Sequence, residues 1–228
     1  MGFEEASGTT ATDQSTFGNN GTLVNGVTRA SAGRFGKCVQ FDGINDIITV
    51  ADSASLDITT AITLEAWIFP LTTMSGAKTA IVKERTSTPA YHLYPNSGTN
   101  VPAGGGFIAA VSKRVLGPSP LPINVGSHLA FTYDGATERL YVNGAQVASK
   151  ATTGTIATTT NALRLGGNTL LGNYFNGRID EARIYNRALS AGEIQADMNT
   201  AVSVQPGRVV AEEPTPVPNA AKDWFFYG

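Results

Sequence analysis

The densest group of potential metal ligands lies near the amino end of the chain, in residues 13–20. Asp13 supplies a carboxylate, Ser15 a hydroxyl and Asn19 an amide oxygen. Calcium binds about six to eight such oxygens, so a calcium site is one prediction. The alternative is that these side chains only form the hydrogen-bonded turns that Asp, Ser and Asn favour. Asp42, which precedes a glycine, is likewise either a further ligand or the first residue of a turn.

A second group combines aromatic rings with planar polar side chains. Residues 91–94 read as a strand in which Tyr91 and Leu93 share one face and His92 and Tyr94 the other. Aromatic rings stack on the apolar faces of sugars, while amide, guanidinium and imidazole groups bond to hydroxyls. The predicted glycan-binding residues are Tyr91, His92, Tyr94, Arg114, Asn173 and Tyr174. The alternative for each of them is that it is an ordinary strand or loop residue whose polar group is hydrogen-bonded within the protein.

The spacing of the acidic residues argues against catalysis. A retaining glycosidase needs two carboxyl groups about 5 Å apart, and the sequence contains no Glu-x-Asp-x-x-Glu strand. Asp180 and Glu181 are adjacent, so on a regular strand their side chains would point to opposite faces. Cys38 lies in an apolar strand, where an inert thiol is expected. We expect a protein that is not an enzyme, although it could be attached to one. A hydrolase or lyase that uses Glu65 or Glu181 is a less favoured alternative.

The elements that must position these groups are strands. Short apolar and β-branched runs recur about every 10 to 15 residues between clusters of Gly, Asn, Asp and Pro, which is typical of a β-sandwich. Asn143-Gly144, between two such runs, predicts a two-residue hairpin turn. Ser190 followed by Glu193 predicts a capping box at the start of one short helix, which ends near Met198.

Charge and hydropathy exclude several classes of protein. The net charge is -2, with 16 Lys and Arg against 18 Asp and Glu, so nothing favours nucleic acid as a partner. The apolar runs are much shorter than the roughly 20 residues of a membrane helix, and no membrane insertion is expected. Residues 203–228 are rich in proline and contain Trp-Phe-Phe-Tyr. We expect one domain over residues 1–202, then a linker and an aromatic segment that belongs to a next module, adds a strand or docks on the domain.

Six segments of the sequence carry a family resemblance. They are residues 9–23, 33–43, 53–57, 62–67, 140–144 and 177–190. In this order they resemble the LamG-like jelly-roll module, laminin G domain family 3, of the concanavalin A-like lectin and glucanase superfamily. The most specific is Asp-Glu-Ala-Arg-Ile-Tyr-Asn-Arg-Ala-Leu-Ser at residues 180–190.

The resemblance implies an all-β fold, a two-sheet antiparallel jelly-roll sandwich with one short C-terminal helix. It also implies that the amino-terminal loop lies close to the last strand, which carries Asp180. The implied structural calcium site would then combine Asp13, Ser15, Asn19, Asp42 and Asp180. The alternative for Asp180 is an ion pair with Arg178 or Arg183. The fold is shared by lectins, adhesion modules and glycosidases, so it does not define the activity.

Together these features predict a non-catalytic, lectin-like carbohydrate-binding module of an extracellular multidomain protein, stabilised by calcium. The expected partner is a glycan or polysaccharide. The alternative is a structural or adhesion module that binds protein or spaces neighbouring domains. We expect an extracellular or cell-surface location, with a native signal peptide missing from this sequence because a strand-like run follows Met1 almost directly.

Overall fold

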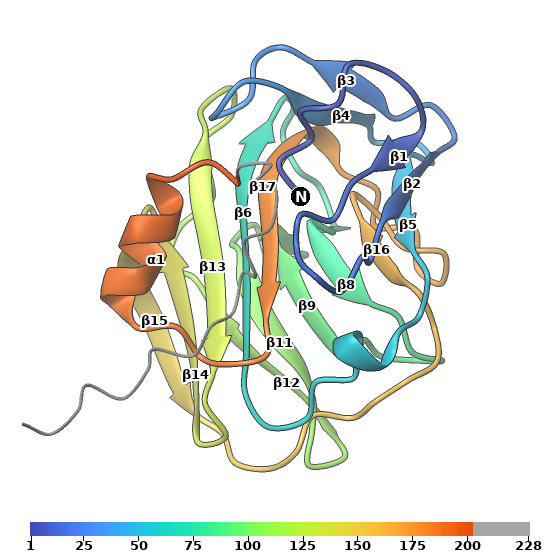
Figure 1. The fold of residues 1–228 in the computed structure, drawn as a ribbon. Coiled ribbons are helices and arrows are strands. Elements are labelled where there is room, and N and C mark those ends of the chain that lie inside the picture. The colour runs from blue at the N-terminus through green and yellow to red at the C-terminus, as the bar shows by residue number, and fades with distance from the viewer. Residues whose placement is uncertain (203–228) are drawn as a thin grey trace, which may run out of the picture.

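The computed structural model describes residues 1–202, and these residues are nearly all β. Two antiparallel sheets pack against each other, and one short helix lies outside them (Figure 1). The predicted two-sheet sandwich is therefore confirmed. The expected linker and aromatic segment at residues 203–228 lie outside the described residues.

The larger sheet has eight strands. In spatial order they are β1 (Thr10–Ala11), β2 (Gly21–Val24), β5 (Ile47–Val50), β16 (Leu163–Leu165), β8 (Ile81–Lys83), β9 (Tyr91–Tyr94), β11 (Ala103–Ile108) and β12 (Val111–Leu116). Neighbours such as β16 and β8 lie far apart in the sequence, so this sheet can form only when distant segments meet.

The smaller sheet has seven strands and contains the last strand of the domain. In spatial order they are β15 (Ala145–Ala151), β14 (Thr137–Val142), β13 (Ser127–Tyr133), β6 (Ile62–Pro70), β17 (Asn176–Tyr185), β4 (Cys38–Asp42) and β3 (Thr28–Ala30). A separate two-stranded ladder pairs β10 (Asn96–Ser97) with β7 (Ala77–Lys78), and Ala54–Leu56 forms a 3-10 turn, η1.

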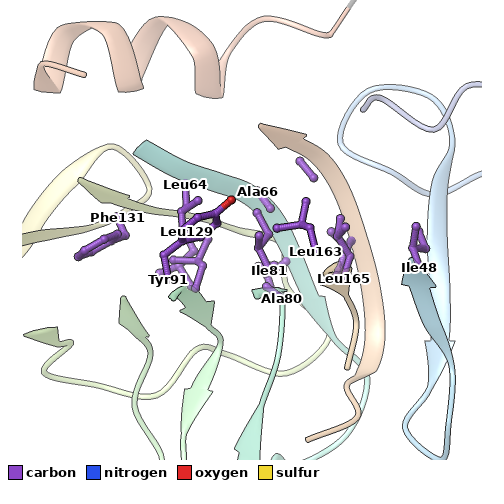
Figure 2. Close-up of a cluster of buried hydrophobic side chains, with 14 of the residues drawn as sticks. Ile48, Leu64, Ala66, Ala80, Ile81, Tyr91, Leu129, Phe131, Leu163 and Leu165 are labelled. Atoms are coloured by element: carbon purple, nitrogen blue, oxygen red, sulfur yellow. The ribbon is translucent and has the colours of Figure 1, made fainter. Parts of the chain in front are cut away.

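The hydrophobic core lies between the two sheets, because alternate residues of their strands point inward. Figure 2 shows Leu64, Leu129 and Phe131 of the smaller sheet opposite Ile81 and Tyr91 of the larger one. All five side chains are buried. The sandwich is thus held together mainly by apolar contacts between the inner faces.

The interior is tightly packed at Gly104 and apolar around Cys38. At Gly104 the sheets approach so closely that an added Cβ would lie 2.4 Å from the ring of Phe131. Cys38 is fully buried on β4, and burial raises the pKa of its thiol to about 11. This environment fits the expected inert thiol.

Local sequence signals fix the hairpin and the helix as predicted. Asn143 and Gly144 both have positive φ, 52° and 76°, and they join β14 to β15 in an antiparallel pair. The helix α1 spans Ala191–Met198. The Ser190 hydroxyl accepts a hydrogen bond from the Glu193 amide, and the Glu193 carboxylate accepts one from the Ser190 amide, which is the predicted capping box.

The helix covers the outer face of the smaller sheet (Figure 1). Its buried residue Ile194, together with Leu189, packs on Ala130 of β13 and Tyr141 of β14. Among the described residues, no helix is long and apolar enough to cross a membrane.

Candidate functional site

Three of the predicted glycan-binding residues, His92, Tyr94 and Arg114, lie on the outer face of the larger sheet. His92 of β9 pairs with Gly105 of β11, which pairs with Arg114 of β12. These three positions therefore form one row across the sheet, and the middle position has no side chain to separate the other two. The side chain of Tyr94, two residues after His92, points to the same face.

His92 and Tyr94 form a stacked pair of rings. Their centroids are 4.3 Å apart and their planes are inclined by 30°. His92 is 4% exposed and Tyr94 is 8% exposed. Burial, and then the nearby charge of Arg114, lower the pKa of His92 to about 3, so its imidazole is neutral at neutral pH. Neither ring nitrogen of His92 has a hydrogen-bond partner among the described residues.

A groove opens beside Tyr94. It has a volume of about 130 Å³. One part of its lining is apolar: Tyr94, together with Leu170 and Leu171, which are 51% and 65% exposed. Another part is polar and contains Glu84 and Asn168. An exposed apolar rim beside fixed polar groups is the general form of a small-ligand site.

Hydrogen bonds fix the polar part of this groove. The Glu84 carboxylate accepts from the Thr169 hydroxyl at 2.9 Å and from Nε of Arg164 at 3.2 Å. The Asn168 side chain accepts from the amide of Leu171 at 2.6 Å. The Thr169 bond joins the β16–β17 connection to Glu84, the residue after β8, and the Arg164 bond joins β16 to the same carboxylate. Polar groups that are held in this way can bind a ligand with little further loss of side-chain freedom.

The groove contains residues that the sequence analysis missed. Glu84, Leu170 and Leu171 were not among the predicted ligands, and Glu84 lies about 85 positions from the two leucines, which only folding brings to it. The available signal was Leu170-Leu171 in a segment that also contains Gly166, Gly167 and Gly172, because loops lie on the surface and apolar side chains exposed there can mark a binding site.

The remaining predicted glycan ligands lie elsewhere. Tyr91 is on the inner face, 2% exposed, and its hydroxyl donates to the Leu56 carbonyl at 3.0 Å. The Asn173 carbonyl accepts from the Thr79 amide at 2.9 Å, and neither Asn173 nor Tyr174 lines the groove. The structure therefore groups His92, Tyr94 and Arg114 on one face, but it separates the other three from them. Of the six predicted residues, only Tyr94 lines the groove. A role in binding stays a prediction for each residue.

The predicted calcium ligands fall into three hydrogen-bonded groups: Asp13 with Ser15 and Asn19, then Asp42, then Asp180. One Asp13 carboxylate oxygen accepts from the Ser15 amide at 2.9 Å, and the other from the Ser15 hydroxyl at 2.7 Å and the Asn19 amide at 2.8 Å. Asp42 accepts from the amide of Ile44 at 2.7 Å. These are the turn contacts given above as the alternative.

Asp180 anchors a different loop. Its carboxylate accepts from the amides of Arg34 at 2.7 Å, Phe35 at 3.1 Å and Glu181 at 2.8 Å. Burial is the main reason that its pKa rises to about 7. Within residues 1–202, no group of three or more His, Cys, Asp or Glu side chains is arranged to hold a metal ion. The five predicted ligands thus do not share one hydrogen-bonded cluster, and calcium binding stays a prediction.

A buried polar cluster lies beneath α1. Glu65 is fully buried, with carboxylate oxygens 3.6 Å from Nη1 of Arg183 and 3.8 Å from Nε2 of His128. Burial, and then the carboxylate of Asp197 on α1, raise the pKa of Glu65. Burial lowers the pKa of His128 to about 4. The cluster ties the helix to the sheet.

The two glutamates of the hydrolase alternative both contact the same arginine. Glu181 is 1% exposed, and its carboxylate lies 2.8 Å from Nη2 of Arg183. A bulge interrupts the strand here, and Glu181 has a positive φ of 53°, so the regular alternation expected for Asp180 and Glu181 does not apply. Arginine pairing, the default reading of strand glutamates, describes both Glu65 and Glu181.

Comparisons with known proteins identify the family. A family model described as the concanavalin A-like lectin/glucanases superfamily matches residues 42–195. The chain therefore belongs to the Laminin G 3 family of this superfamily. Pappalysin-1 from Mus musculus is 42% identical over 78 residues, which are 32% of this chain and 5% of the length of that relative.

Several solved structures share the fold. Domain 4 of AbnA, a GH43 extracellular arabinanase from Geobacillus stearothermophilus solved with arabinotriose, has a TM-score of 0.65 at 22% identity, covering 80% of this chain and 89% of that domain. The binding domain of Paraclostridial Mosquitocidal Protein 1 has a TM-score of 0.66 at 19% identity, covering 82% of this chain and 49% of that one. A putative carbohydrate binding protein from Bacteroides ovatus has a TM-score of 0.55 at 20% identity, covering 69% and 45%.

Proposed function

We propose that this chain is a non-catalytic carbohydrate-binding module that holds a glycan in the groove beside Tyr94. The observation that carries the proposal is the lining of this groove, in which a tyrosine and two exposed leucines adjoin Glu84 and Asn168. Likeness to a domain solved with arabinotriose, and to a putative carbohydrate binding protein, supports the same class of ligand.

The groove chemistry matches a sugar better than a purely apolar ligand. A pyranose or furanose ring has an apolar face that can lie on Leu170, Leu171 and the edge of Tyr94, and hydroxyls that Glu84 and Asn168 can bond. Its volume of about 130 Å³ is well below the roughly 300 to 1,000 Å³ of drug-sized pockets. A single sugar unit of a longer glycan is therefore the expected occupant.

Such a site would bind weakly and act through tethering. A millimolar dissociation constant corresponds to only about -4 kcal/mol, but a linked module raises the local concentration of its partner domain at a polymer. We place the module in an extracellular multidomain protein, as the extracellular arabinanase domain among its structural neighbours suggests. Structural calcium at the amino-terminal loop is part of this proposal.

The proposal is tested by glycan-array screening followed by titration calorimetry with the best ligand. Leu171→Asp should weaken binding at least about tenfold, because it removes apolar area and adds a charge at the rim. Val125→Asp is the matched control, since Val125 is also an exposed aliphatic residue, at 52%, but does not line the groove. Its affinity should stay unchanged.

Three results would overturn the proposal. Equal loss in both variants would show that the effect is not specific to the groove. No binding to any glycan on the array, together with capture of a protein partner, would favour the adhesion alternative. Release of reducing sugar that Glu65→Gln or Glu181→Gln abolishes would establish a hydrolase or lyase instead.

A further inference from the structure

The groove beside Tyr94 has one basic side chain in its wall, that of Arg85. Arg85 is partly buried and belongs to the connection between β8 and β9. Among the described residues that line the groove, Glu84 is the one acidic side chain and Arg85 the one basic side chain. The charge that the groove presents to a ligand therefore depends on how these two neighbours are paired.

The negative charge of Glu84 is offset within the protein. Its side chain is 5% exposed, and one carboxylate oxygen lies 3.2 Å from Nε of Arg164. The other oxygen accepts hydrogen bonds from the amide and the hydroxyl of Thr169. Because a cation and two further donors already surround this carboxylate, it repels an approaching anion only weakly.

The positive charge of Arg85 is not offset in this way. Within residues 1–202, no ion pair joins its guanidinium to a carboxylate. Its Cζ lies 3.9 Å from the centroid of the Phe107 ring, and its Nη1 donates to the Thr88 hydroxyl at 3.0 Å. Stacking on a ring uses the flat face of the guanidinium, so most of its five in-plane N–H groups remain able to donate to a ligand.

A second arginine, Arg114, lies on the same face of the larger sheet. It is exposed and pairs with Gly105 of β11. Phe107, on which Arg85 stacks, is two residues after Gly105 and so points to the same face. Burial raises the pKa of the Tyr94 phenol to about 12, and the nearby charge of Arg114 acts in the opposite direction. The surface around Tyr94 is therefore locally positive.

We propose that the groove selects a uronic acid unit of a glycan, and that Arg85 binds its carboxylate. This inference rests on the proposed function, because it names the class of sugar that the same groove holds. A carboxylate is planar and can accept two parallel N–H bonds from one guanidinium. The sugar ring would lie on Leu171 and Tyr94, as for a neutral sugar, and the carboxylate of a neighbouring unit could reach Arg114.

Local contacts, rather than the overall field, carry this selectivity. The net charge of the chain is -2, so the protein as a whole does not attract anions. Hydrogen bonds between charged groups are among the strongest in proteins, so loss of the ligand carboxylate should weaken binding at least about tenfold. Salt screens exposed charge pairs, so this advantage should shrink as the ionic strength rises.

Matched pairs of ligands test the proposal on the full chain. Oligosaccharides of galacturonate, glucuronate, mannuronate and guluronate are titrated by calorimetry, each beside the same oligosaccharide with its carboxyl groups reduced to hydroxymethyl groups. At least one acidic form should bind at least about tenfold more tightly than its reduced form. Arg85→Gln should bring this ratio close to one. Arg178→Gln is the matched control, since Arg178 also lies over a phenylalanine ring, that of Phe69 at 5.2 Å, but on β17 of the smaller sheet. It should leave the ratio unchanged.

Salt dependence provides a second measurement that needs no variant. Raising the ionic strength from about 0.05 M to about 0.5 M should weaken binding of the acidic oligosaccharide and leave binding of its reduced form unchanged. Equal weakening of both forms would contradict the inference. It would also be wrong if Arg85→Gln and Arg178→Gln lowered the ratio equally.

The remaining outcomes separate this inference from the proposed function. Equal affinity within every acidic and reduced pair, with neutral glycans still bound, would overturn the uronic acid and leave the carbohydrate-binding module in place. A sulfated oligosaccharide that binds more tightly than every uronate, and loses its affinity in Arg85→Gln, would assign Arg85 to sulfate and overturn the inference as well. No binding to any glycan, acidic or neutral, would overturn the proposed function and this inference together.

Discussion

The imidazole of His92 stacks on the phenol ring of Tyr94, with 4.3 Å between the ring centroids. This contact keeps the histidine buried and neutral, because burial lowers its pKa from 6.5 to about 3. In the unfolded chain the imidazole binds a proton below about pH 6.5. The stability linked to His92 is therefore fully present above that pH and is lost as the pH falls toward 3.

Replacing His92 by phenylalanine should remove this acid sensitivity. Between about pH 7.5 and about pH 5, the free energy of unfolding of the unmodified protein should fall by about 2 kcal/mol more than that of His92→Phe. The phenyl ring preserves the stacking on Tyr94, so the variant should fold. Urea denaturation at the two pH values measures the difference, and parallel losses in both proteins would contradict the assignment of a buried neutral imidazole.

The pH dependence of stability that is linked to Glu65 should have the opposite sign. Burial and Asp197 raise its folded pKa, so the linked stability is present below the ordinary glutamate pKa of 4.5 and is lost as the pH rises through the folded value. Glu65→Gln should therefore become more stable relative to the unmodified protein between about pH 5 and about pH 8. Glu193→Gln is the control, since the Ser190 amide lowers the pKa of Glu193 and its carboxylate stays charged over that range. If the difference in free energy of unfolding between Glu65→Gln and the unmodified protein were the same at about pH 5 and about pH 8, this prediction would be refuted.

Two glycine substitutions should have effects of opposite sign. Gly104→Ala should destabilise the domain by about 1 to 3 kcal/mol, because its Cβ would meet the Phe131 ring at 2.4 Å. Gly192→Ala should stabilise α1 by up to about 1 kcal/mol, since nothing lies within 4 Å of its added Cβ and alanine favours a helix. Thermal melts of both variants provide the comparison. A tolerated Gly104→Ala would mean that the sheets separate easily at Phe131.

Calcium binding at the amino-terminal loop has a direct test. If the ion stabilises the fold, calcium at about 100 times its dissociation constant adds about 2.7 kcal/mol. EDTA should then lower the melting temperature by several degrees, as for any loss of this size. Asp13→Asn should abolish the difference between calcium and EDTA. Identical melts of the unmodified protein in the two conditions would leave Asp13 as a turn residue only.

Local signals in the sequence predicted the parts of the fold that depend on neighbouring residues. The capping box at Ser190 and the turn at Asn143-Gly144 each need only a few consecutive residues, and both are present. Alternation along β9 correctly separated Tyr91 from His92, but it could not say which face is the core. That choice depends on the second sheet, whose strands come from distant parts of the chain.

The candidate groove was harder to predict for the same reason. Glu84 and Leu171 meet only because β8 pairs with β16, and no short motif encodes that pairing. The bulge at Glu181 was also not predicted, because its sequence does not contain the glycine that usually marks a positive φ. Single positions whose roles depend on long-range packing were therefore the least predictable part of the site.

The burial of Cys38 provides an internal reporter. It is the single cysteine of the sequence, and its thiol remains protonated well above neutral pH. Alkylating reagents need the thiolate, so they should label the protein only during excursions in which β4 detaches. Labelling kinetics under native conditions would then measure how often the sandwich opens, without the need to introduce any probe.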